Sequence, residues 1–502
     1  MLAEPNAEAP GAHPAVGALL WVVPALTAIV AGLLHGPWFI DDAYITFRYA
    51  EHLAAGHGLV FNPGEPVLGT TTPLFAAILA LLKVVGIAVP TAAKALGLLS
   101  MAGVVLLLQA FARRAMPRWT AAAMAVCVAL HPDTAFMATS GMETASSLAC
   151  VLGALFLALH QRWWLAGLVA GAALLTRPDG VLVIGLVVAV ALLRDRRRAW
   201  QPLVTSAAVF LPWAAYAMAT YGSPAPHSIK AKRLIHEAPF GDVLSGHLGF
   251  LTQNPPLTVL LALGVVGFGF AVARRSDLLL VALWMGAYFG SLAVSGIAPQ
   301  FAWYATPLTV TGVVLAAYGA DQVVAALKSR FGTDAPAWLR ETAASALLLL
   351  IAVWGLTDVN WHSFRTDLER RESAYLEIGA WIAERAEPGE VVFVGEVGVL
   401  GYLLLDQVVV DSSGINHPRI HELRRDDLAA LRAKAPPDSV SIEGSPEWVQ
   451  QVIDELAPRY VVTKYPWLHI GKIEDSAGFQ ALYDRVGPDN IQLIDYRVYR
   501  RR

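Results

Sequence analysis

Two adjacent carboxylates, Asp41 and Asp42, follow directly after the first long apolar run of the chain. A carboxylate at a membrane surface can act as a general base that takes the proton of an incoming hydroxyl group. The residues behind the pair that recur at helical spacing are Tyr44, Phe47, Arg48 and His52. The segment is therefore expected to lie on the bilayer as an amphipathic helix with its charged face toward water. The alternative is an ordinary interfacial loop whose acids end the preceding helix.

A second polar segment, residues 226–233, reads PHSIKAKR and is rich in basic residues. The three cations of the segment, Lys230, Lys232 and Arg233, can hold a lipid phosphate. The segment is expected on the outer side of the membrane, where its charge opposes the usual bias of Lys and Arg toward the cytoplasm. The alternative is a cluster of side chains that reach the lipid headgroups without binding a ligand.

Two further acidic positions interrupt apolar runs. Glu143 opens an apolar run, and Arg177 and Asp179 lie in the turn TRPDG between two such runs. Ionisable groups at membrane depth cost free energy unless they are paired or hydrated, so each is a candidate for a functional site. The simpler readings are that Glu143 caps a helix and that Arg177 and Asp179 only pair with each other.

Aromatic residues mark one more candidate, because Trp303 and Tyr304 lie at a predicted membrane interface and a sugar ring can stack on Trp303. Most interfacial aromatic belts carry no chemistry. No metal site or cofactor is predicted, since Asp41 and Asp42 alone would hold a divalent ion weakly. A serine hydrolase is not favoured either, because the sequence has no GxSxG motif.

The composition requires a membrane. Of the 502 residues 56% are hydrophobic and only 15% are charged, and the mean hydropathy is +0.51. Such a chain has too little polar surface for a soluble protein, and nucleic acid is not expected as a partner. Both cysteines, Cys127 and Cys150, lie in apolar runs, so the sequence suggests neither a disulfide framework nor a thiolate metal site.

About eleven membrane-spanning helices are predicted from stretches of about 20 mostly apolar residues. They are Ala15–Leu34, Ala92–Phe111, Trp119–Met137, Thr144–Leu159, Trp163–Thr176, Val181–Leu193, Trp200–Thr220, Pro256–Ala273, Leu278–Ile297, Trp303–Leu327 and Ala343–Leu356. Clusters of Arg and Lys in alternate loops are expected to be cytoplasmic. Everything after Asp358 is then extracytoplasmic. The N-terminus is cytoplasmic if residues 73–87 lie on the membrane surface and extracytoplasmic if they cross the membrane.

One stretch, Pro73–Ile87, is apolar but interrupted by Lys83, so it can be a short span or a surface helix. The surface-helix reading places Asp41 and Asp42 outside with the other polar motifs, and the spanning reading places them in the cytoplasm. We adopt the surface helix, because only that choice gathers the polar motifs on one side.

From about Arg370 the composition becomes that of a soluble domain. The predicted order is a helix at Ser373–Ala386, strands at Val391–Gly395 and Val408–Asp411, helices at Arg425–Lys434 and Pro446–Leu456, and strands at Tyr460–Lys464 and Ile491–Tyr499. This alternation predicts a small sheet covered by helices. The expected organisation is thus a transmembrane domain at 1–369, with a first extracytoplasmic loop at 36–90, and an α/β domain at 370–502.

The stretch DDAYITFRYAEHLAAGHGLVFNPGEPVLGTTTP resembles the first extracytoplasmic loop of the membrane-embedded C-type (GT-C) glycosyltransferases. It is nearest to the branch of the cell-wall arabinofuranosyltransferases that use a polyprenyl-phosphate sugar. The segments GMET, TRPDG and HSIKAK resemble further motifs of that branch in the same order, and the segment from Gly395 to Pro418 resembles its C-terminal domain.

The resemblance implies an α-helical polytopic membrane fold and an inverting transfer of a hexosyl or pentosyl unit from a polyprenyl phosphate to an acceptor hydroxyl. The acceptor is a glycan, lipid or protein of the cell envelope, and the enzyme is expected in the plasma (inner) membrane. Asp41 or Asp42 would be the base. The donor phosphate would be bound by Arg48, Arg177, Lys230 and Lys232, and the substrates would be contacted by Tyr44, Glu143, Asp179, His227, Trp303 and Tyr304.

Two other classes of function stay open at this point. A transporter or flippase for a lipid-linked or anionic solute would also use cations on the outer face, but the paired halves with broken helices that such carriers often show are not evident in the sequence. In a third reading the spans only anchor a binding domain. The sugar, the acceptor and the oligomeric state do not follow from the sequence.

Overall fold

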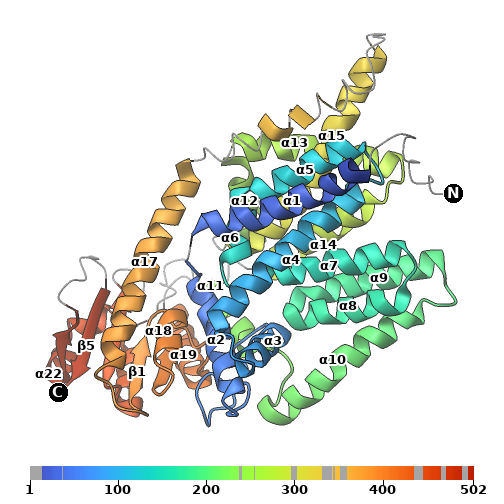
Figure 1. The fold of residues 1–502 in the computed structure, drawn as a ribbon. Helices are drawn as coiled ribbons and strands as arrows, with labels where there is room; N and C mark the ends of the chain where they lie inside the picture. Colours follow the sequence, from blue (N-terminus) through green and yellow to red (C-terminus); the bar gives the residue numbers. More distant parts are fainter. Residues whose placement is uncertain are drawn as a thin grey trace. The chain divides into compact units, whose positions relative to one another are not determined.

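The structure is a computed structural model that describes residues 14–36, 38–236, 240–253, 255–295, 302–330, 359–434, 445–464, 471–488 and 496–502, with a few residues between 342 and 350. The chain divides into two compact units, which we describe separately (Figure 1). The first unit contains residues 1–37, 93–212 and 238–362, and the second contains residues 38–92, 213–237 and 363–502. The second unit thus joins the first-loop segment to the C-terminal residues, whereas the predicted domain boundary at residue 370 stays a prediction.

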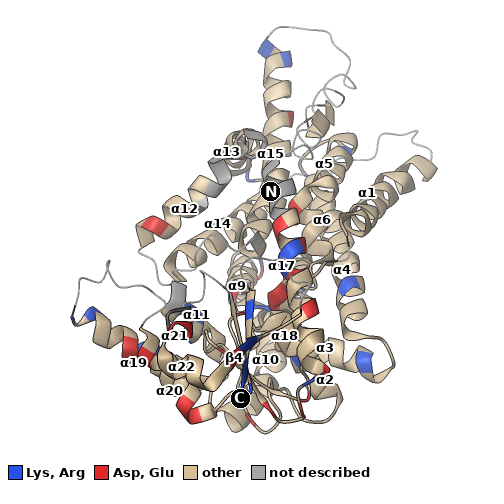
Figure 2. Ribbon diagram, turned by 90° about the vertical axis from the view of Figure 1, so that its left-hand side faces the viewer, with Lys and Arg blue, Asp and Glu red and all other residues tan. Residues whose placement is uncertain are grey.

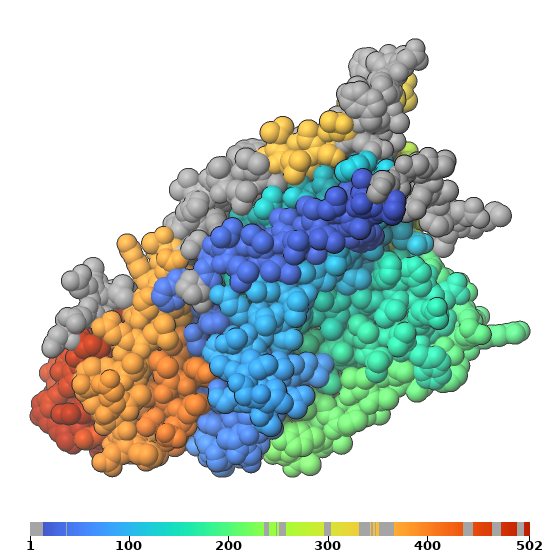
Figure 3. Space-filling view, in the orientation of Figure 1, coloured from blue at the N-terminus to red at the C-terminus, as the bar shows by residue number. Residues whose placement is uncertain are grey.

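The first unit is built from apolar helices. They are α1 (Pro14–His35), most of α4 (Val89–Ala112), α5 (Arg118–Leu130), α6 (Pro132–Thr139), α7 (Thr144–Leu159), α8 (Trp163–Thr176), the 3-10 turn η1 (Pro178–Gly180), α9 (Val181–Arg194), the first part of α10 (Trp200–Tyr221), α12 (Phe240–Gln253), α13 (Pro255–Ala273), α14 (Leu278–Ser295) and α15 (Ala302–Arg330). Helix α1 packs against α5 and α6 and exposes its other side, where Leu19, Leu26 and Leu33 are each more than half exposed (Figure 3).

Exposed leucines of this kind suit a lipid solvent, and charged residues are sparse along these helices (Figure 2). Among the described residues, α1, α4, α10, α14 and most of α15 are long and apolar enough to cross a membrane. The pair α5 and α6 makes a sixth span if it is counted as one. The chain is therefore a multi-pass membrane protein, although the predicted number of eleven spans is not confirmed.

Two of the predicted spans need comment. The span expected at Trp119–Met137 is broken, because α5 and α6 meet at His131–Pro132 with a bend of 60°. Proline has no N–H to donate and disfavours helical geometry in the residue before it, which explains the break. Most of the predicted last span, Ala343–Leu356, falls outside the described residues.

In the second unit, helix α2 (Asp41–Ala54) packs against α3 (Pro73–Val84), whose 12 residues correspond to about 18 Å of helix. That length is well short of a hydrocarbon core of about 30 Å, in agreement with a surface helix. Helix α11 (His227–His236) and most of α17 (Val359–Ala383) also belong to this unit.

A five-stranded sheet completes the second unit, in the order β2-β1-β3-β5-β4. Its strands are β1 (Val391–Val394), β2 (Val408–Asp411), β3 (Tyr460–Lys464), β4 (Tyr483–Val486) and β5 (Tyr496–Arg501). Strand β1 runs parallel to β2 and β3, with Val392 opposite Val409 and Tyr460, whereas β5 runs antiparallel to β3 and β4. The helices are α18 (Gly398–Leu403), α19 (Pro418–Arg432), α20 (Pro446–Leu456), α21 (Gly471–Glu474) and α22 (Ala477–Leu482).

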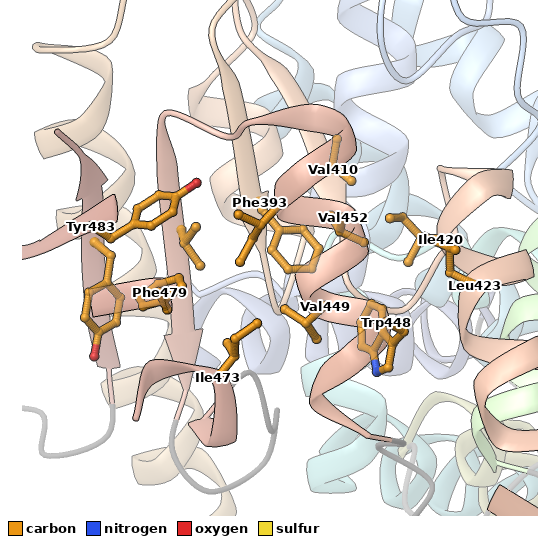
Figure 4. Close-up of a cluster of buried hydrophobic side chains, with 13 residues drawn as sticks. Phe393, Val410, Ile420, Leu423, Trp448, Val449, Val452, Ile473, Phe479 and Tyr483 are labelled. Atoms are coloured by element: carbon orange, nitrogen blue, oxygen red, sulfur yellow. The ribbon is translucent and has the colours of Figure 1, made fainter. Parts of the chain in front are cut away.

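The predicted α/β order of this region is confirmed. The bounds of β2, α20 and β3 agree with the prediction, whereas α18, α21, α22 and β4 were not predicted. One apolar core, which includes Phe393, Trp448, Val449 and Tyr499, lies between the sheet and helices α19 to α22 (Figure 4). Buried apolar side chains at each of these positions stabilise the domain by about 1.5–3 kcal/mol each.

Candidate active site

Helix α2 begins at the two carboxylates, since Ile40 still has extended backbone angles and Asp41 and Asp42 form the first turn. Negative side chains in that position stabilise a helix through its dipole. The prediction that the charged face of α2 points to water is wrong, because Arg48 is fully buried and His52 is 4% exposed. The second unit buries this face against the residues that follow β1.

Asp41 is held by backbone groups of α18. Its Oδ2 accepts the N–H of Gly398 at 3.0 Å and its Oδ1 accepts the N–H of Val399 at 2.8 Å. A Cβ atom at position 398 would overlap the backbone carbonyl of Asp41, so only glycine allows this approach. Asp41 is 7% exposed and both of its oxygens are engaged.

Asp42 has a different environment. Its Oδ2 lies 2.9 Å from Nζ of Lys232. The side chain of Asp42 is 25% exposed and that of Lys232 is 29% exposed. Lys232 comes from α11, 190 residues later in the chain. The structure therefore brings together the first-loop acid and the basic segment, as the sequence predicted, and leaves both within reach of a ligand.

Arg48 donates five hydrogen bonds inside the unit. Nε bonds to the carbonyl of Phe61 at 2.6 Å, Nη1 bonds to the carbonyls of Gly401 and Leu404, and Nη2 bonds to Oδ1 of Asn62 at 3.0 Å and to the carbonyl of Gln407 at 2.9 Å. These bonds account for all five N–H groups of a guanidinium. Arg48 thus connects α2 to the segment around α18. None of its N–H groups remains to bind the donor phosphate, which is the role that the family resemblance implies for it.

Asn62 continues this connection at the edge of the sheet. Its side-chain amide donates to the carbonyl of Val409 at 3.0 Å and accepts the N–H of Val409 at 3.1 Å. Strand β2 is an edge strand, and an edge strand presents unpaired backbone groups. The first-loop segment covers that edge with one side chain.

A partly buried ionic cluster lies next to Asp41. Arg371 of α17 lies 2.9 Å from Oε1 of Glu372 and 3.9 Å from Oε2 of Glu396. Burial, reinforced by Glu396, raises the pKa of the Asp41 carboxyl, and burial with the nearby Asp41 raises the pKa of Glu372 to about 8. Asp41 accepts two backbone N–H bonds, which favour its ionised form, whereas Oε2 of Glu372 has no hydrogen-bond partner. Near neutral pH the proton therefore resides on Glu372 rather than on Asp41.

The remaining predicted residues of the second unit lie along α2 and α11. Tyr44 is 8% exposed, and its ring packs edge-on against Phe47 and at a tilt of 52° against Tyr402. The backbone N–H of His227 donates to the carbonyl of Leu68 at 2.7 Å. Lys230 is exposed on the same helix.

The other predicted residues form a cluster in the first unit. Arg177, which follows α8, lies 3.1 Å from Oε1 of Glu143 and 2.9 Å from Oδ2 of Asp179. Its guanidinium carbon lies 5.2 Å from the ring centroid of Tyr304, which in turn is 6.0 Å from the ring of Trp303. That this cluster and the Asp42–Lys232 pair form one site stays a prediction.

Four tail residues around these contacts were missed by the sequence reasoning. Gly398 and Gly401 belong to a GxxGxxG run whose spacing does not fit a dinucleotide, and their role is close packing against α2 and Phe61. Asn416 and His421 lie beside Tyr49 and His227. A usable signal was the repeated His at 417 and 421, four positions apart.

Within the described ranges, no group of three or more His, Cys, Asp and Glu residues is arranged to hold a metal ion.

Solved structures with the same fold are membrane enzymes. ArnT from Cupriavidus metallidurans, in a crystal structure bound to undecaprenyl phosphate, superposes with a TM-score of 0.60 over 97% of this chain and 98% of that chain, at 14% identity. The archaeal oligosaccharyltransferase AglB from Archaeoglobus fulgidus, in complex with an inhibitory peptide and a dolichol phosphate, superposes with a TM-score of 0.59 over 89% of this chain and 69% of that chain, at 13% identity. The chain has the GT-C glycosyltransferase fold.

The GT-C fold agrees with the resemblance seen in the first-loop motifs. In sequence, the chain is 30% identical over 247 residues to the terminal beta-(1->2)-arabinofuranosyltransferase of Mycobacterium tuberculosis, and this alignment covers 42% of the chain. The match spans 38% of the length of that relative. Residues 360–499 match the family model of a domain of unknown function, DUF8728. The comparisons thus support a GT-C, arabinofuranosyltransferase-like chain and do not favour the transporter reading.

Proposed function

We propose that the protein is an integral-membrane glycosyltransferase that moves a sugar from a polyprenyl-phosphate donor to a hydroxyl group of a cell-envelope acceptor. The observation that carries the proposal is the contact of 2.9 Å between Oδ2 of Asp42 and Nζ of Lys232. A transfer of this kind needs a base for the incoming hydroxyl and a cation for the departing phosphate. The pair supplies both on accessible side chains.

In the proposed reaction the acceptor oxygen attacks the anomeric carbon of the donor sugar. The bond between that carbon and the phosphate oxygen breaks, and its electron pair leaves with the polyprenyl phosphate. The acceptor hydroxyl gives its proton to a carboxylate oxygen of Asp42. Lys232 stabilises the negative charge that grows on the phosphate, with Lys230, two residues earlier in α11, as a second cation. One displacement of this type inverts the anomeric carbon.

Asp41 and Arg48 then serve as positioning residues. Asp41 fixes the first turn of α2 on α18, and Arg48 fixes its third turn on the same segment. Because both contacts flank Asp42 along α2, they hold the base in one orientation. Catalytic groups need such support, since a misplacement of about 1 Å costs about 10²-fold in rate.

The donor class is supported by the structural neighbours. ArnT is bound to undecaprenyl phosphate and AglB to a dolichol phosphate, and the sequence relative is named for arabinofuranosyl transfer. We propose a polyprenyl-phosphate pentose or hexose as donor; the phosphate-binding role of Arg177 and the sugar-stacking role of Trp303, both in the first unit, stay predictions. Glu143 and Asp179 orient the Arg177 guanidinium in this scheme.

The proposed setting is the plasma (inner) membrane, with the N-terminus in the cytoplasm and residues 370–502 outside. A cysteine at position 63 tests the first loop, because Pro63 is exposed whereas the neighbouring Asn62 is buried and hydrogen-bonded. In a chain without Cys127 and Cys150, an impermeant maleimide should label Pro63→Cys in intact cells. A matched Arg196→Cys chain in a predicted cytoplasmic loop should react only after the cells are opened, and the reverse pattern rejects the orientation.

Activity is tested with the full chain in lipid nanodiscs and a radiolabelled polyprenyl-phosphate arabinose. A transferase makes a new glycosidic bond, so the label should move into a product of increased mass when an arabinofuranosyl acceptor is added. A carrier leaves the donor intact in the same assay. Lys232→Met should lower kcat by about 10² or more while the protein stays folded, and unchanged turnover in this variant would reject the role of the pair.

A further inference from the structure

Buried polar atoms without a hydrogen-bond partner gather where α11 meets α19. They include Nε2 of His227, Nδ1 of His421 and Nδ2 of Asn416, and the neighbouring Oγ of Ser228 and Nδ1 of His417 also lack partners. Asn416 is only 1% exposed. Nearly all buried polar side-chain atoms in folded proteins are hydrogen-bonded, so such a local concentration is typical of a place that a ligand completes.

Independent contacts hold three of these side chains in one place. The rings of His227 and His421 lie edge to face with their centroids 5.2 Å apart. Oδ1 of Asn416 lies 3.3 Å from the hydroxyl of Tyr49, which donates to the carbonyl of Val67 at 2.7 Å and accepts the N–H of Gly69. The backbone of His227 bonds to Leu68, the residue before Gly69. The unpartnered atoms are therefore preorganised.

The chemistry of the cluster matches sugar hydroxyl groups. Burial lowers the pKa of both His227 and His421, so both imidazoles are neutral at pH 7, and each has one nitrogen that donates and one that accepts. A hydroxyl group also donates and accepts, and the amide nitrogen of Asn416 adds a donor. A phosphate would need several cations, whereas Lys230 lies near both rings and Arg425 lies near the ring of His421 alone.

Helix α11 connects this cluster to the Asp42–Lys232 pair. Lys232 follows His227 by five residues, which is about 7.5 Å along a helix axis. A short oligosaccharide can bridge that distance. We infer that His227, Asn416 and His421 form an acceptor subsite that binds the hydroxyl groups of a glycan whose reacting end points toward Asp42. The inference rests on the proposed function for the identity of the glycan and adds tail residues that the sequence did not indicate.

The test uses direct binding, so that it does not depend on turnover. The full chain in nanodiscs is titrated with an octyl arabinofuranosyl trisaccharide and, separately, with octyl phosphate, without any sugar donor. His421→Ala and Asn416→Asp are compared with Arg432→Ala, an exposed residue at the other end of α19. Asn416→Asp keeps an oxygen toward Tyr49 and replaces the amide donor by a carboxylate oxygen, which also brings a buried negative charge. Thermal unfolding checks that each variant is folded.

We expect the Kd of the trisaccharide to rise about tenfold in His421→Ala and in Asn416→Asp and to stay unchanged in Arg432→Ala. The Kd of octyl phosphate should not change in any of them. The subsite is rejected if the wild type does not bind the trisaccharide, if both folded variants bind it as tightly as the wild type, or if only phosphate binding falls. A histidine-dependent affinity for the trisaccharide in a chain without transferase activity would reject the proposed function and retain the glycan site.

Discussion

Asp41 and Asp42 are neighbours in the sequence, but α2 turns their carboxylates toward different partners. Asp41 faces the backbone N–H groups of Gly398 and Val399, whereas Asp42 faces the ammonium group of Lys232. Successive residues of a helix point about 100° apart, so one side chain meets the buried contact and the next stays accessible. Asp41 therefore makes a structural contact, whereas Asp42 is the candidate base. The two roles predict different behaviour of the two mutants.

Asp42→Asn should lower kcat by about 10²–10⁴-fold with little change in thermal stability, because an amide cannot accept the acceptor proton and the Asp42–Lys232 pair is partly exposed. Asp41→Asn should instead destabilise the protein by about 1–3 kcal/mol, because the amide N–H₂ then faces a backbone N–H. Turnover and thermal unfolding of the two variants in the same detergent check this division. Equal turnover in Asp42→Asn and the wild type, at equal protein levels, removes the base assignment.

Gly398→Ala should weaken the contact between α2 and α18, since the added Cβ would overlap the carbonyl of Asp41. Both partners are backbone and cannot move away cheaply, so we expect a loss of about 1–3 kcal/mol or more. Gly478→Ala is the matched control, because position 478 lies in α22 with open space around its Cβ. That variant should be neutral or slightly more stable. Chemical denaturation followed by tail-domain tryptophan fluorescence compares the two, and equal loss in both would contradict the packing role.

The sequence was sufficient for the parts of the fold that depend on local pattern. Apolar runs located α1, α4, α10 and α14, and the alternation of short apolar strands with helices located β1, β2 and β3. The break at Pro132 was available from the chemistry of proline but was overlooked in favour of a continuous apolar run. Length and composition set these elements, and neither requires knowledge of a distant partner.

The contacts that build the site depend on residues hundreds of positions apart. Arg48 meets carbonyls more than 350 residues later, and nothing in the first loop indicates that its charge is buried. A helical pattern with an Arg next to acids is typical of a solvated face, which is why α2 was expected to face water. The Asp42–Lys232 contact was expected from the resemblance to the GT-C motifs and agrees with the structure, whereas no site role was predicted for Asn416 or His421.

Arg48→Lys separates a positioning role from a phosphate-binding role. A lysine has three donors on one atom and cannot reach the carbonyls and the amide that Arg48 joins, so the carbonyls of Phe61, Leu404 and Gln407 would lose partners. We expect a destabilisation of about 3–5 kcal/mol, measured by thermal unfolding, with the donor KM of the folded fraction changed by about twofold at most. Arg425→Lys, on the exposed face of α19, should behave as the wild type. A fully stable Arg48→Lys with a strongly raised donor KM would restore the phosphate role.

The buried carboxyl of Glu372 should make stability depend on pH. Its pKa is raised from 4.5 to about 8, first by burial and then by the nearby Asp41. The folded state therefore holds a proton that the unfolded state releases above about pH 4.5. The stabilisation that this bound proton gives is fully present below pH 4.5 and is lost as the pH rises through 8. The free energy of unfolding falls by on the order of 3–5 kcal/mol across that range.

Glu372→Gln mimics the protonated acid at every pH. Its stability at pH 5 should be close to that of the wild type, and at pH 8 it should exceed the wild type, so its thermal unfolding curve should shift less between the two pH values. Some slope should remain, because burial also raises the pKa of Asp41. Glu377→Gln lies on the exposed face of the same helix and should follow the wild-type slope. If Glu372→Gln keeps the full wild-type slope, the proton resides elsewhere in the cluster, and Glu372 is then held as an anion by Arg371 alone.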